Sequence, residues 1–359
     1  MKVIITAGGT GGHIYPALAI ANKIMEKEPN SEILYIGTHN RMEKDIVPAA
    51  GYKYEAIEIY GFSKTMMIRN FKNINLILKA QKKCIKIMKE FKPDVVVGVG
   101  GYVAFPVIKA AKKLGIKTFI HEQNSIPGKS NRWLAKKADK IGVSFKDTLK
   151  YFEPKKTILT GNPCGENAIN IKALPKSKYG LDPKKKSILI VSGSLGSTAV
   201  NNKMLEFLNS VSEEAYDVLY VTGKATYDDF SKNKFSKNVH VVPYIDNMPG
   251  LMKGIDLMVT RAGASTISEI LALKIPSIFI PSPYVANNHQ YYNSLSIKNA
   301  GAGDLLEESE FTADKLKEKI NKILGNKKLY EEMQTNLEKM SINNSSTIIY
   351  DILKDLVKK

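Results

Sequence analysis

The sequence predicts an α/β fold made of parallel sheets with crossover helices. Short runs of β-branched and aliphatic residues alternate with segments of helical periodicity along all 359 residues, and each half has a glycine-rich turn after an early strand. The expected strands are Val3–Thr6, Ile33–Ile36, Asp94–Val97, Lys117–Ile120, Lys140–Val143, Ser187–Val191, Asp217–Val221, Val239–Val242, Asp256–Val259 and Ser277–Ile280. This rhythm indicates two similar α/β domains in tandem.

The chain is too long for one ordinary hydrophobic core, which also favours two domains. The polar stretch that begins near Asn162 is the expected break, so the first domain covers residues 1–162 and the second covers residues 163–340. Residues 341–359 are expected to form a last amphipathic helix with the apolar stripe Ile348, Ile349, Ile352, Leu353, Leu356 and Val357. The sequence leaves open whether this helix packs back on the first domain.

The composition is that of a soluble globular protein, with 43% hydrophobic and 25% charged residues. The most apolar stretch, Val95–Ala111, is interrupted by glycines, Pro106 and Lys109, so we expect no membrane span. The chain starts directly with a strand, without the pattern of a signal peptide. Cys84 and Cys164 have no metal-binding spacing, and a reducing cytoplasm fits them.

The formal net charge of +18 is concentrated between Lys64 and Lys92, where Glu90 is the one acid. Such a patch suits nucleic acid, anionic lipid or a phosphorylated substrate. The sequence has no aromatic RNA-reading motif and no zinc-ligand pattern, so we expect no nucleic-acid partner. The segment Phe71–Phe91 mixes lysines with apolar residues at roughly helical spacing, namely Phe71, Ile74, Leu78, Ile85 and Met88. We expect it to contact an anionic membrane surface, and the alternative is a core-facing helix with a solvated basic side.

The turn Gly8–Gly12, followed by His13, stands between a strand and a helix. Glycines let backbone N–H groups approach a phosphate, and the helix dipole favours negative charge there. The turn is neither a Walker loop nor a dinucleotide fingerprint, because the Lys and the third glycine that these require are missing. A tight strand–helix connection is the alternative. His13 favours chemistry, because it places a group that titrates near neutral pH at this turn.

Four more motifs follow expected strands. They are Gly98–Tyr102 and His121–Asn124 in the first half, and Thr260–Glu269 and Asn287–Gln290 in the second. Ligands of open α/β sheets bind outside the carboxyl ends of the strands, where all of these motifs are expected. Glu269 can accept hydrogen bonds from a ribose diol, or it is only a partner of the helix dipole. The amides of Asn287–Gln290 suit sugar hydroxyls, or they belong to a solvated loop.

Together, and in this order, the motifs resemble the MurG family over nearly the whole chain. These bacterial glycosyltransferases add N-acetylglucosamine (GlcNAc) to the undecaprenyl-linked muramoyl-peptide lipid I, which gives lipid II for peptidoglycan. The resemblance implies a GT-B architecture, in which two Rossmann-like domains face each other across a cleft. It also implies that the first domain binds the acceptor and the second binds UDP-GlcNAc, with the enzyme at the cytoplasmic face of the cell membrane as a peripheral protein.

The resemblance places the UDP-GlcNAc site on Thr10, Gly11, Gly12, Asn124, Ser194, Ile245, Ala264, Ser265, Thr266, Ile267, Ser268, Glu269 and Gln290. Glu269 is expected on the ribose, the Ile245 backbone on the uracil, and Asn124 and Gln290 on the sugar. Ser194 and the glycine turns are expected to hold the donor diphosphate, and Gly100, Gly101 and Tyr102 the acceptor diphosphate. Many family members carry an Arg where this chain has Gly165. Either another cation replaces it, with Arg261 the nearest candidate, or the contact is dispensable, and we assign no site residue at Gly165.

The implied reaction is an inverting displacement, which needs a base for the acceptor hydroxyl and stabilisation of the leaving diphosphate. His13 is the first candidate for the base and Glu122 the second; His13 could instead be a ligand of the acceptor diphosphate. No Asp-x-Asp motif follows a strand, so we expect neither a required metal nor a cofactor. The alternative functions are transfer to another lipid such as diacylglycerol, and, less favoured, a UDP-sugar epimerase or a nucleotide-binding module, which would leave His13 and Glu122 without a role.

Overall fold

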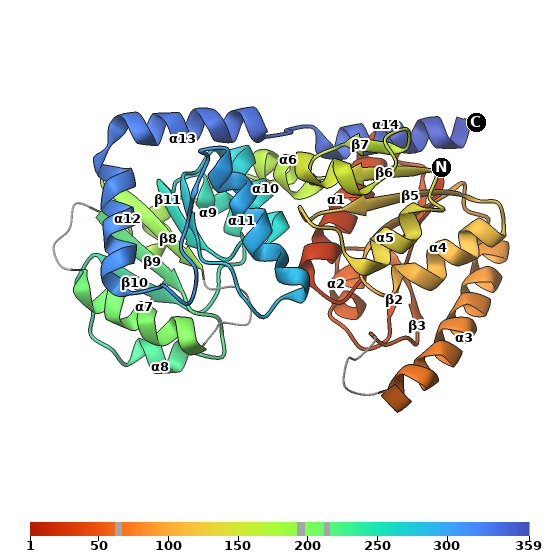
Figure 1. Ribbon diagram of the computed structural model, residues 1–359, viewed down its shortest axis with the longest axis horizontal. Coiled ribbons are helices and arrows are strands. Elements are labelled where there is room, and N and C mark those ends of the chain that lie inside the picture. Colours follow the sequence, from red (N-terminus) through yellow and green to blue (C-terminus); the bar gives the residue numbers. More distant parts are fainter. Residues whose placement is uncertain (62–66, 192–197, 212–215, 359) are drawn as a thin grey trace. The chain divides into compact units, whose positions relative to one another are not determined.

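The computed structural model describes residues 1–61, 67–191, 198–211 and 216–358 (Figure 1). The chain forms two compact units. The first unit contains Met1–Cys164 together with Asn344–Lys359, and the second unit contains Gly165–Asn343. Each unit is built on its own parallel sheet, and each is described separately below.

The first unit has a seven-stranded parallel sheet in the order β3-β2-β1-β4-β5-β6-β7. Its strands are β1 (Lys2–Ala7), β2 (Glu32–Thr38), β3 (Lys53–Ile57), β4 (Val95–Gly100), β5 (Lys117–Glu122), β6 (Lys140–Val143) and β7 (Thr157–Leu159). The helices of this part of the chain are α1 (Gly11–Lys27), α2 (Glu43–Ala49), α3 (Met67–Phe91), α4 (Ala104–Lys113), α5 (Lys129–Ala135), the 3-10 helix η1 (Lys146–Tyr151), α6 (Pro163–Asn170, which crosses the boundary between the units) and α14 (Ser345–Lys358).

The sheet of the first unit has a separate hydrophobic core on each face. Successive side chains of a strand point to opposite faces, so Val96 of β4 joins the core under α3, α4 and α5. Val95 and Val97 join the other core, which α1 and α14 cover. Burial on both faces explains why the central strands are continuous apolar runs rather than alternating ones.

Helix α14 belongs to the first unit although it lies at the far end of the sequence. Ile349 and Leu353, one turn apart, are fully buried in the same core as α1. At the edge of this contact, the Tyr350 hydroxyl donates to Glu28 Oε1 at 2.8 Å, and Lys354 forms an ion pair with the same carboxylate. The amphipathic stripe expected in this segment is therefore the face that packs on the first unit.

Helix α3 presents only part of its expected apolar stripe to solvent. Met88 is buried in the core and Ile85 packs against that core, whereas Ile74 and Leu78 are about half exposed. Ile85 and Met88 therefore face the core, as the alternative interpretation of this segment expects, whereas Ile74 and Leu78 lie on the exposed side. The side chain of Phe71 lies outside the described residues.

The second unit has a six-stranded parallel sheet in the order β10-β9-β8-β11-β12-β13. Its strands are β8 (Lys186–Val191), β9 (Tyr216–Val221), β10 (Val239–Val242), β11 (Leu257–Thr260), β12 (Ser277–Phe279) and β13 (Asp304–Leu305). The helices are η2 (Lys176–Tyr179), α7 (Thr198–Ser210), α8 (Tyr227–Ser231), α9 (Met248–Met252), α10 (Ala264–Leu273), η3 (Ala286–Asn288), α11 (His289–Asn299), α12 (Ala313–Gly325) and α13 (Lys327–Met340).

Both sheets have the same topological switch point. The strand order reverses between β1 and β4 in the first unit and between β8 and β11 in the second. Ligand crevices of doubly wound sheets lie outside the carboxyl ends of the strands at such a point. The turn Gly8–Gly12 follows β1, Gly101 follows β4, and the segment that leads into α10 follows β11. These three motifs thus stand at the switch points of their own units.

Candidate functional site

Two glycine turns meet at the switch point of the first unit. Gly101 adopts a φ of +81°, and a Cβ added there would collide with the Gly8 carbonyl oxygen. A backbone atom cannot rotate away as a side chain can, so the close approach of the two turns requires glycine at position 101. The predicted neighbourhood of the motifs after β1 and β4 is therefore present.

A buried carboxylate, which the sequence analysis missed, lies beneath the first turn. Glu43 of α2 accepts hydrogen bonds from Gly9 N at 3.1 Å, from Thr38 N at 3.2 Å and from Thr38 Oγ1 at 2.6 Å. The Gly9 N–H is thus bound to the protein and is not available to a phosphate. The first N–H groups of α1, at Gly11 and Gly12, remain the candidates for binding an anion, because the first turn of a helix lacks intrahelical partners.

The imidazole of His13 lies against the backbone of β4. A Cβ added at Gly100, which has a φ of +115°, would stand 2.6 Å from His13 Nδ1. The same Nδ1 is 3.1 Å from Gln123 Oε1, at hydrogen-bond distance. Gly100 therefore makes the space in which the half-buried His13 ring reaches Gln123.

Behind His13 runs a buried chain of hydrogen bonds. Gln123 Nε2 lies 2.8 Å from the Val99 carbonyl and 3.0 Å from His121 Nδ1. His121 Nε2 lies 2.9 Å from the Gly161 carbonyl. His121 is fully buried, and because burial disfavours the imidazolium, its pKa is lowered to about 4. The ring of His121 is therefore neutral near pH 7.

Glu122 has a different environment from His13. Its buried carboxylate accepts four hydrogen bonds, from Asn124 N (3.0 Å), Asn124 Nδ2 (3.2 Å), Gly128 N (3.0 Å) and Asn131 Nδ2 (2.9 Å). By accepting these four bonds, the Glu122 carboxylate fixes the conformation of the loop between β5 and α5. A carboxylate that is saturated in this way suits loop organisation, and of the two candidates for the base the geometry favours His13.

In the second unit, α10 begins without a side-chain cap. Its N-cap is Gly263, and its first turn has no acidic residue. The Ser265 hydroxyl is buried and has no hydrogen-bond partner among the described residues. Ser268 Oγ donates to the Ser265 carbonyl at 2.7 Å, which leaves the first N–H groups of the helix unaffected. Uncapped N–H groups at a helix N-terminus are suited to an anionic oxygen.

Glu269 lies one turn further along α10. No hydrogen bond or ion pair from the described part of the chain reaches its carboxylate. Burial raises the pKa of the Glu269 carboxyl to about 8. The Glu269 residue remains partly exposed, so solvent or a ligand can reach it. A carboxyl that is partly desolvated and has no partner among the described residues is typical of a group that a ligand satisfies.

Gln290 stands at the start of α11. It follows Asn287 and Asn288, whose φ values of 55° and 48° make the sharp turn into the helix. Gln290 Oε1 accepts from Ser282 N at 2.9 Å, so its amide N–H₂ faces away from this contact as a donor. Ile245 is buried in the loop after β10. Ser194 lies outside the described residues.

The structure accounts for the departure from the family pattern at Gly165. A Cβ at this position would stand 2.8 Å from the Ser268 carbonyl oxygen of α10, so α6 and α10 approach too closely for any side chain. Arg261, the expected substitute cation, is buried and forms a 2.7 Å ion pair with Glu308, while its NH1 also donates to the Ile280 carbonyl. Because Glu308 neutralises it, Arg261 does not supply a free positive charge.

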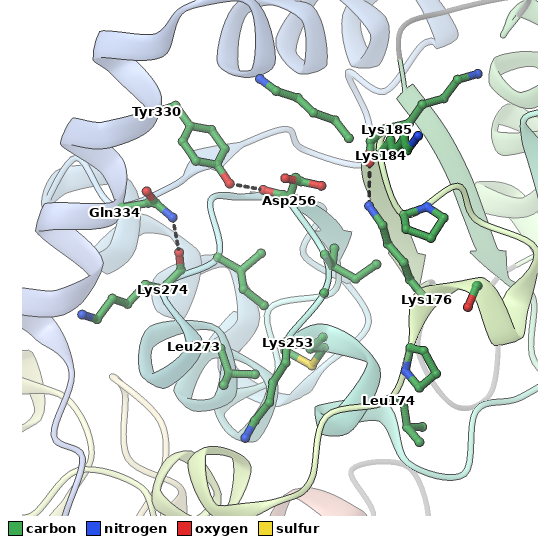
Figure 2. A pocket seen from close by; sticks show the side chains of 18 residues that line it. Leu174, Lys176, Lys184, Lys185, Lys253, Asp256, Leu273, Lys274, Tyr330 and Gln334 are labelled. Atoms are coloured by element: carbon green, nitrogen blue, oxygen red, sulfur yellow. Dashed lines mark hydrogen bonds between the residues drawn. The ribbon is translucent and has the colours of Figure 1, made fainter.

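A cavity of about 660 Å³ lies elsewhere on the second unit (Figure 2). Its lysines are Lys176, Lys184, Lys185, Lys186, Lys253 and Lys274. Several of these ammonium groups are held by backbone carbonyls; Lys176, for example, donates to Lys185 O at 2.5 Å, and Lys253 to Ile169 O at 2.6 Å. The cavity is at the edge where β8 and β11 start, opposite the N-terminus of α10, so it is separate from the candidate site.

The predicted site residues are divided between the units. Thr10, Gly11, Gly12, Asn124 and the turn Gly100–Tyr102 belong to the first unit, whereas Ile245, Ala264–Glu269 and Gln290 belong to the second. Within the described ranges, no group of three or more His, Cys, Asp or Glu side chains is arranged to hold a metal ion.

Comparison with known proteins identifies the class of enzyme that this fold and these motifs define. Residues 3–143 match the glycosyltransferase family 28 N-terminal domain, and residues 187–349 match the C-terminal domain of the same family. The chain belongs to glycosyltransferase family 28.

Three similar proteins show how specific the match is. The Pediococcus pentosaceus UDP-N-acetylglucosamine–N-acetylmuramyl-(pentapeptide) pyrophosphoryl-undecaprenol N-acetylglucosamine transferase is 40% identical over 100% of both chains. The crystal structure of Acinetobacter baumannii MurG is similar with a TM-score of 0.79 and 27% identity over 99% of both chains. The UDP-GlcNAc 2-epimerase of Neisseria meningitidis, at 17% identity and a TM-score of 0.69 over 99% of this chain and 100% of that one, shares the fold alone. The predicted GT-B fold class and the resemblance to the MurG family are confirmed.

Proposed function

We propose that the protein transfers GlcNAc from UDP-GlcNAc to the 4-hydroxyl of lipid I, undecaprenyl-diphospho-N-acetylmuramoyl-pentapeptide, and so produces lipid II for peptidoglycan synthesis. The observation that carries this proposal is the 40% identity over the full length of a transferase named for this reaction. Because that identity includes the first unit as well as the nucleotide-binding half, it supports the acceptor as well as the donor. An epimerase needs no acceptor site, and its likeness to this chain is limited to the fold.

The proposed reaction is a single displacement with inversion at the anomeric carbon. His13 takes the proton of the acceptor hydroxyl while the oxygen attacks, and UDP leaves with the electron pair of the broken bond. The leaving diphosphate gains negative charge, and the uncapped N-terminus of α10 is suited to stabilise it. The carboxylate of Glu269, which has no partner among the described residues, is suited to the two ribose hydroxyls, which agrees with the role expected from the family.

The remaining roles in this proposal follow the family resemblance. Asn124 and the amide N–H₂ of Gln290 bind the sugar, and the Ile245 backbone binds the uracil. Thr10, Gly11, Gly12 and Ser194 contribute to the donor diphosphate, and Gly100, Gly101 and Tyr102 to the acceptor diphosphate. Ala264, Ser265, Thr266, Ile267 and Ser268 form the turn that presents the N-terminus of α10.

Product analysis tests the proposed function. The protein is incubated with UDP-GlcNAc and either lipid I or diacylglycerol, and the release of UDP and the lipid products are followed. We expect UDP release that depends on lipid I and a β-1,4-linked disaccharide product. Transfer to diacylglycerol alone would establish the other lipid acceptor instead. Consumption of UDP-GlcNAc without any acceptor, giving an epimeric sugar nucleotide, would reject both transferase functions.

The acceptor is a polyprenyl lipid, so the enzyme has to reach a bilayer surface. No helix in the described ranges combines the length and apolar character needed to cross a membrane. We propose that the exposed face of α3 makes the contact at the cytoplasmic side. Ile74, Leu78 and Lys82 follow one another at four-residue spacing on this face, which combines apolar and basic side chains.

A charge reversal on α3 tests this contact. Lys83 already pairs with Glu55, and Lys86 lies 3.9 Å from Glu90, so the informative lysines are Lys79, Lys82 and Lys89. Changing these three to Glu should reduce sedimentation with vesicles that contain anionic lipid and slow transfer to membrane-embedded lipid I. Transfer to a short-chain, water-soluble acceptor should remain near normal. The matched control changes Lys232, Lys234 and Lys237 of the second unit to Glu, and equal loss of vesicle binding in both variants would reject a contact at α3.

A further inference from the structure

The side-chain amide of Gln123 has only one orientation that satisfies its neighbours. Its Nε2 is 2.8 Å from the Val99 carbonyl oxygen, which can only accept a hydrogen bond. The nitrogen must therefore face Val99, and Oε1 must face His13 Nδ1 at 3.1 Å. An amide oxygen can only accept, so the proton of this bond is on His13 Nδ1.

His121 fixes the same orientation independently. Its Nε2 is 2.9 Å from the Gly161 carbonyl, so this nitrogen carries the proton of the neutral ring. His121 Nδ1 is then an acceptor, and it receives a hydrogen bond from Gln123 Nε2 at 3.0 Å. The Val99 carbonyl oxygen and His121 Nδ1 are both acceptors, so each of them independently requires the amide nitrogen of Gln123 to face it.

We propose that Gln123, supported by His121, is a positioning residue that holds His13 as the Nδ1–H tautomer and so makes Nε2 its basic nitrogen. The inference rests on the proposed function, in which His13 is the base. In the reaction, the proton of the acceptor hydroxyl moves to His13 Nε2 as the new carbon–oxygen bond forms and the bond to UDP breaks. The resulting imidazolium keeps its Nδ1–H bonded to Gln123 Oε1 until the proton on Nε2 is released to solvent.

The opposite amide orientation would disable the base. Rotating the Gln123 amide by half a turn would place Oε1 against the Val99 carbonyl and the lone pair of His121 Nδ1. It would also direct an N–H toward His13 Nδ1, and the proton of His13 would have to move to Nε2. The acceptor hydroxyl would then meet a donor instead of a base. A neutral amide partner thereby sets which nitrogen is basic, a role that a carboxylate performs in many catalytic histidines.

The tautomer can be measured directly on the full-length protein. The chain has five histidines, so ¹⁵N-histidine labelling gives few signals, and two-bond ¹⁵N–¹H correlations identify which ring nitrogen carries the proton. The signals of His13 are assigned as those that disappear in His13→Ala. We expect His13 to carry its proton on Nδ1 in the unmodified protein.

Three variants separate positioning from folding. Gln123→Met removes both hydrogen-bonding ends of the side chain and should give a mixture of His13 tautomers. It should lower kcat by about 10–100-fold, which is part of the rate that a general base contributes, and should change the donor KM little. Gln123→Glu keeps an acceptor oxygen opposite His13, and in its protonated form its O–H can donate to the Val99 carbonyl in place of the amide, so it should retain the Nδ1–H tautomer and most of kcat. Thr118→Val, the matched control, removes a buried hydroxyl of β5 that bonds Asp139 and should change neither.

The outcomes distinguish this inference from the proposed function. A His13 proton on Nε2 in the unmodified protein, or an unchanged tautomer in Gln123→Met, would overturn the positioning role. If the tautomer responds as expected but His13→Ala retains full turnover, the positioning stands as a structural fact and the assignment of His13 as the base fails. If Gln123→Met does not fold, Gln123→Glu decides, because loss of the Nδ1–H tautomer in a folded Gln123→Glu contradicts the inference.

Discussion

The two switch-point crevices share a strand order and differ in what occupies their turns. In the first unit, protein groups fill the crevice: Glu43 binds the Gly9 N–H, and the His13 ring lies against Gly100. In the second unit, the helix after β11 starts at Gly263 without a side-chain cap, and Glu269 has no partner among the residues described. The first crevice is organised around a ring that can move a proton, whereas the second leaves its polar groups for a ligand.

This difference shows how one topology supports two tasks. In both units the loops lie at the carboxyl edge of the sheet. The side chains of these loops determine whether the backbone N–H groups are hydrogen-bonded within the protein or remain available to a ligand. The contrast predicts that mutation of His13 in the first crevice changes turnover, while mutation of Glu269 in the second changes donor affinity.

The largest expected effect tests the first crevice. His13→Ala should lower kcat by ~10²–10⁴-fold, because a positioned base contributes that much, while the affinity for UDP-GlcNAc stays nearly unchanged. Turnover at saturating substrates and donor binding by calorimetry measure the two quantities. If His13→Ala instead raises only the acceptor KM, His13 is a ligand of the acceptor diphosphate. In that case Gly100→Ala, which displaces the ring, should also raise the acceptor KM and leave kcat unchanged.

The second crevice should respond in affinity. Glu269→Gln is expected to weaken UDP-GlcNAc binding at least tenfold, because a charge-assisted hydrogen bond is worth about 1.5–3 kcal/mol. An unchanged dissociation constant in a folded variant would remove Glu269 from the site.

The raised pKa of Glu269 adds a pH dependence with a definite sign. Its pKa is about 8, so the carboxyl is largely protonated at pH 7 and must lose its proton to accept two hydroxyl hydrogen bonds. Donor affinity should therefore rise from pH 6.5 to about 8 and level off above it, with proton release on binding. Calorimetry in buffers of different ionisation enthalpy measures the release, which should vanish in Glu269→Gln.

The packing of α6 on α10 predicts a change in stability. Gly165→Ala should destabilise the second unit by about 1–3 kcal/mol, because its Cβ meets the Ser268 carbonyl at 2.8 Å and the two helices must separate. Urea unfolding measures the effect. Gly325→Ala is the matched control in the same unit, since nothing lies within 4 Å of a Cβ there, and it should be neutral or slightly stabilising. Equal stability of the two variants would contradict the proposed tight contact.

The smallest expected effect is at Glu28 of the first unit. The hydrogen bond from Lys354, followed by that from Tyr350, lowers the pKa of Glu28 to about 2. A carboxylate with a lowered pKa stabilises the fold above its unfolded value of 4.5, and this contribution is lost as the pH falls from 4.5 toward 2. Glu28→Gln should cost about 1 kcal/mol at pH 7, since the pair is partly exposed, and thermal unfolding should show the difference shrink below pH 4.5.

The sequence predicted the central strands better than the edges of the sheets. A strand that is buried on both faces reads as an apolar run, as Val95–Val97 does. Three of the four edge strands, β3, β7 and β13, had no such signal. In β3, polar residues alternate with Tyr54 and Ala56 and most of the strand is partly exposed, while β13 has only two residues. Pairing with a neighbouring strand, which is a long-range property, defines these elements.

The candidate site shows the same division. His13 and Gly101 could be found because they follow strands in recognisable turns. Glu43 could not, because its contact with Gly9 joins positions that are 34 residues apart and no motif surrounds it. Gln123 stood inside a predicted motif, but its significance depends on the direction of the Val99 carbonyl, which the sequence does not specify.

The location of α14 sets an order of events during synthesis. The second unit is continuous in sequence, and all of it leaves the ribosome before α14 does. Until Ile349 and Leu353 emerge, part of the apolar core beside Val95 and Val97 has no cover, and a nascent chain in that state is exposed to chaperones and to aggregation. The first unit, most of which is translated first, is therefore the last to complete its hydrophobic core.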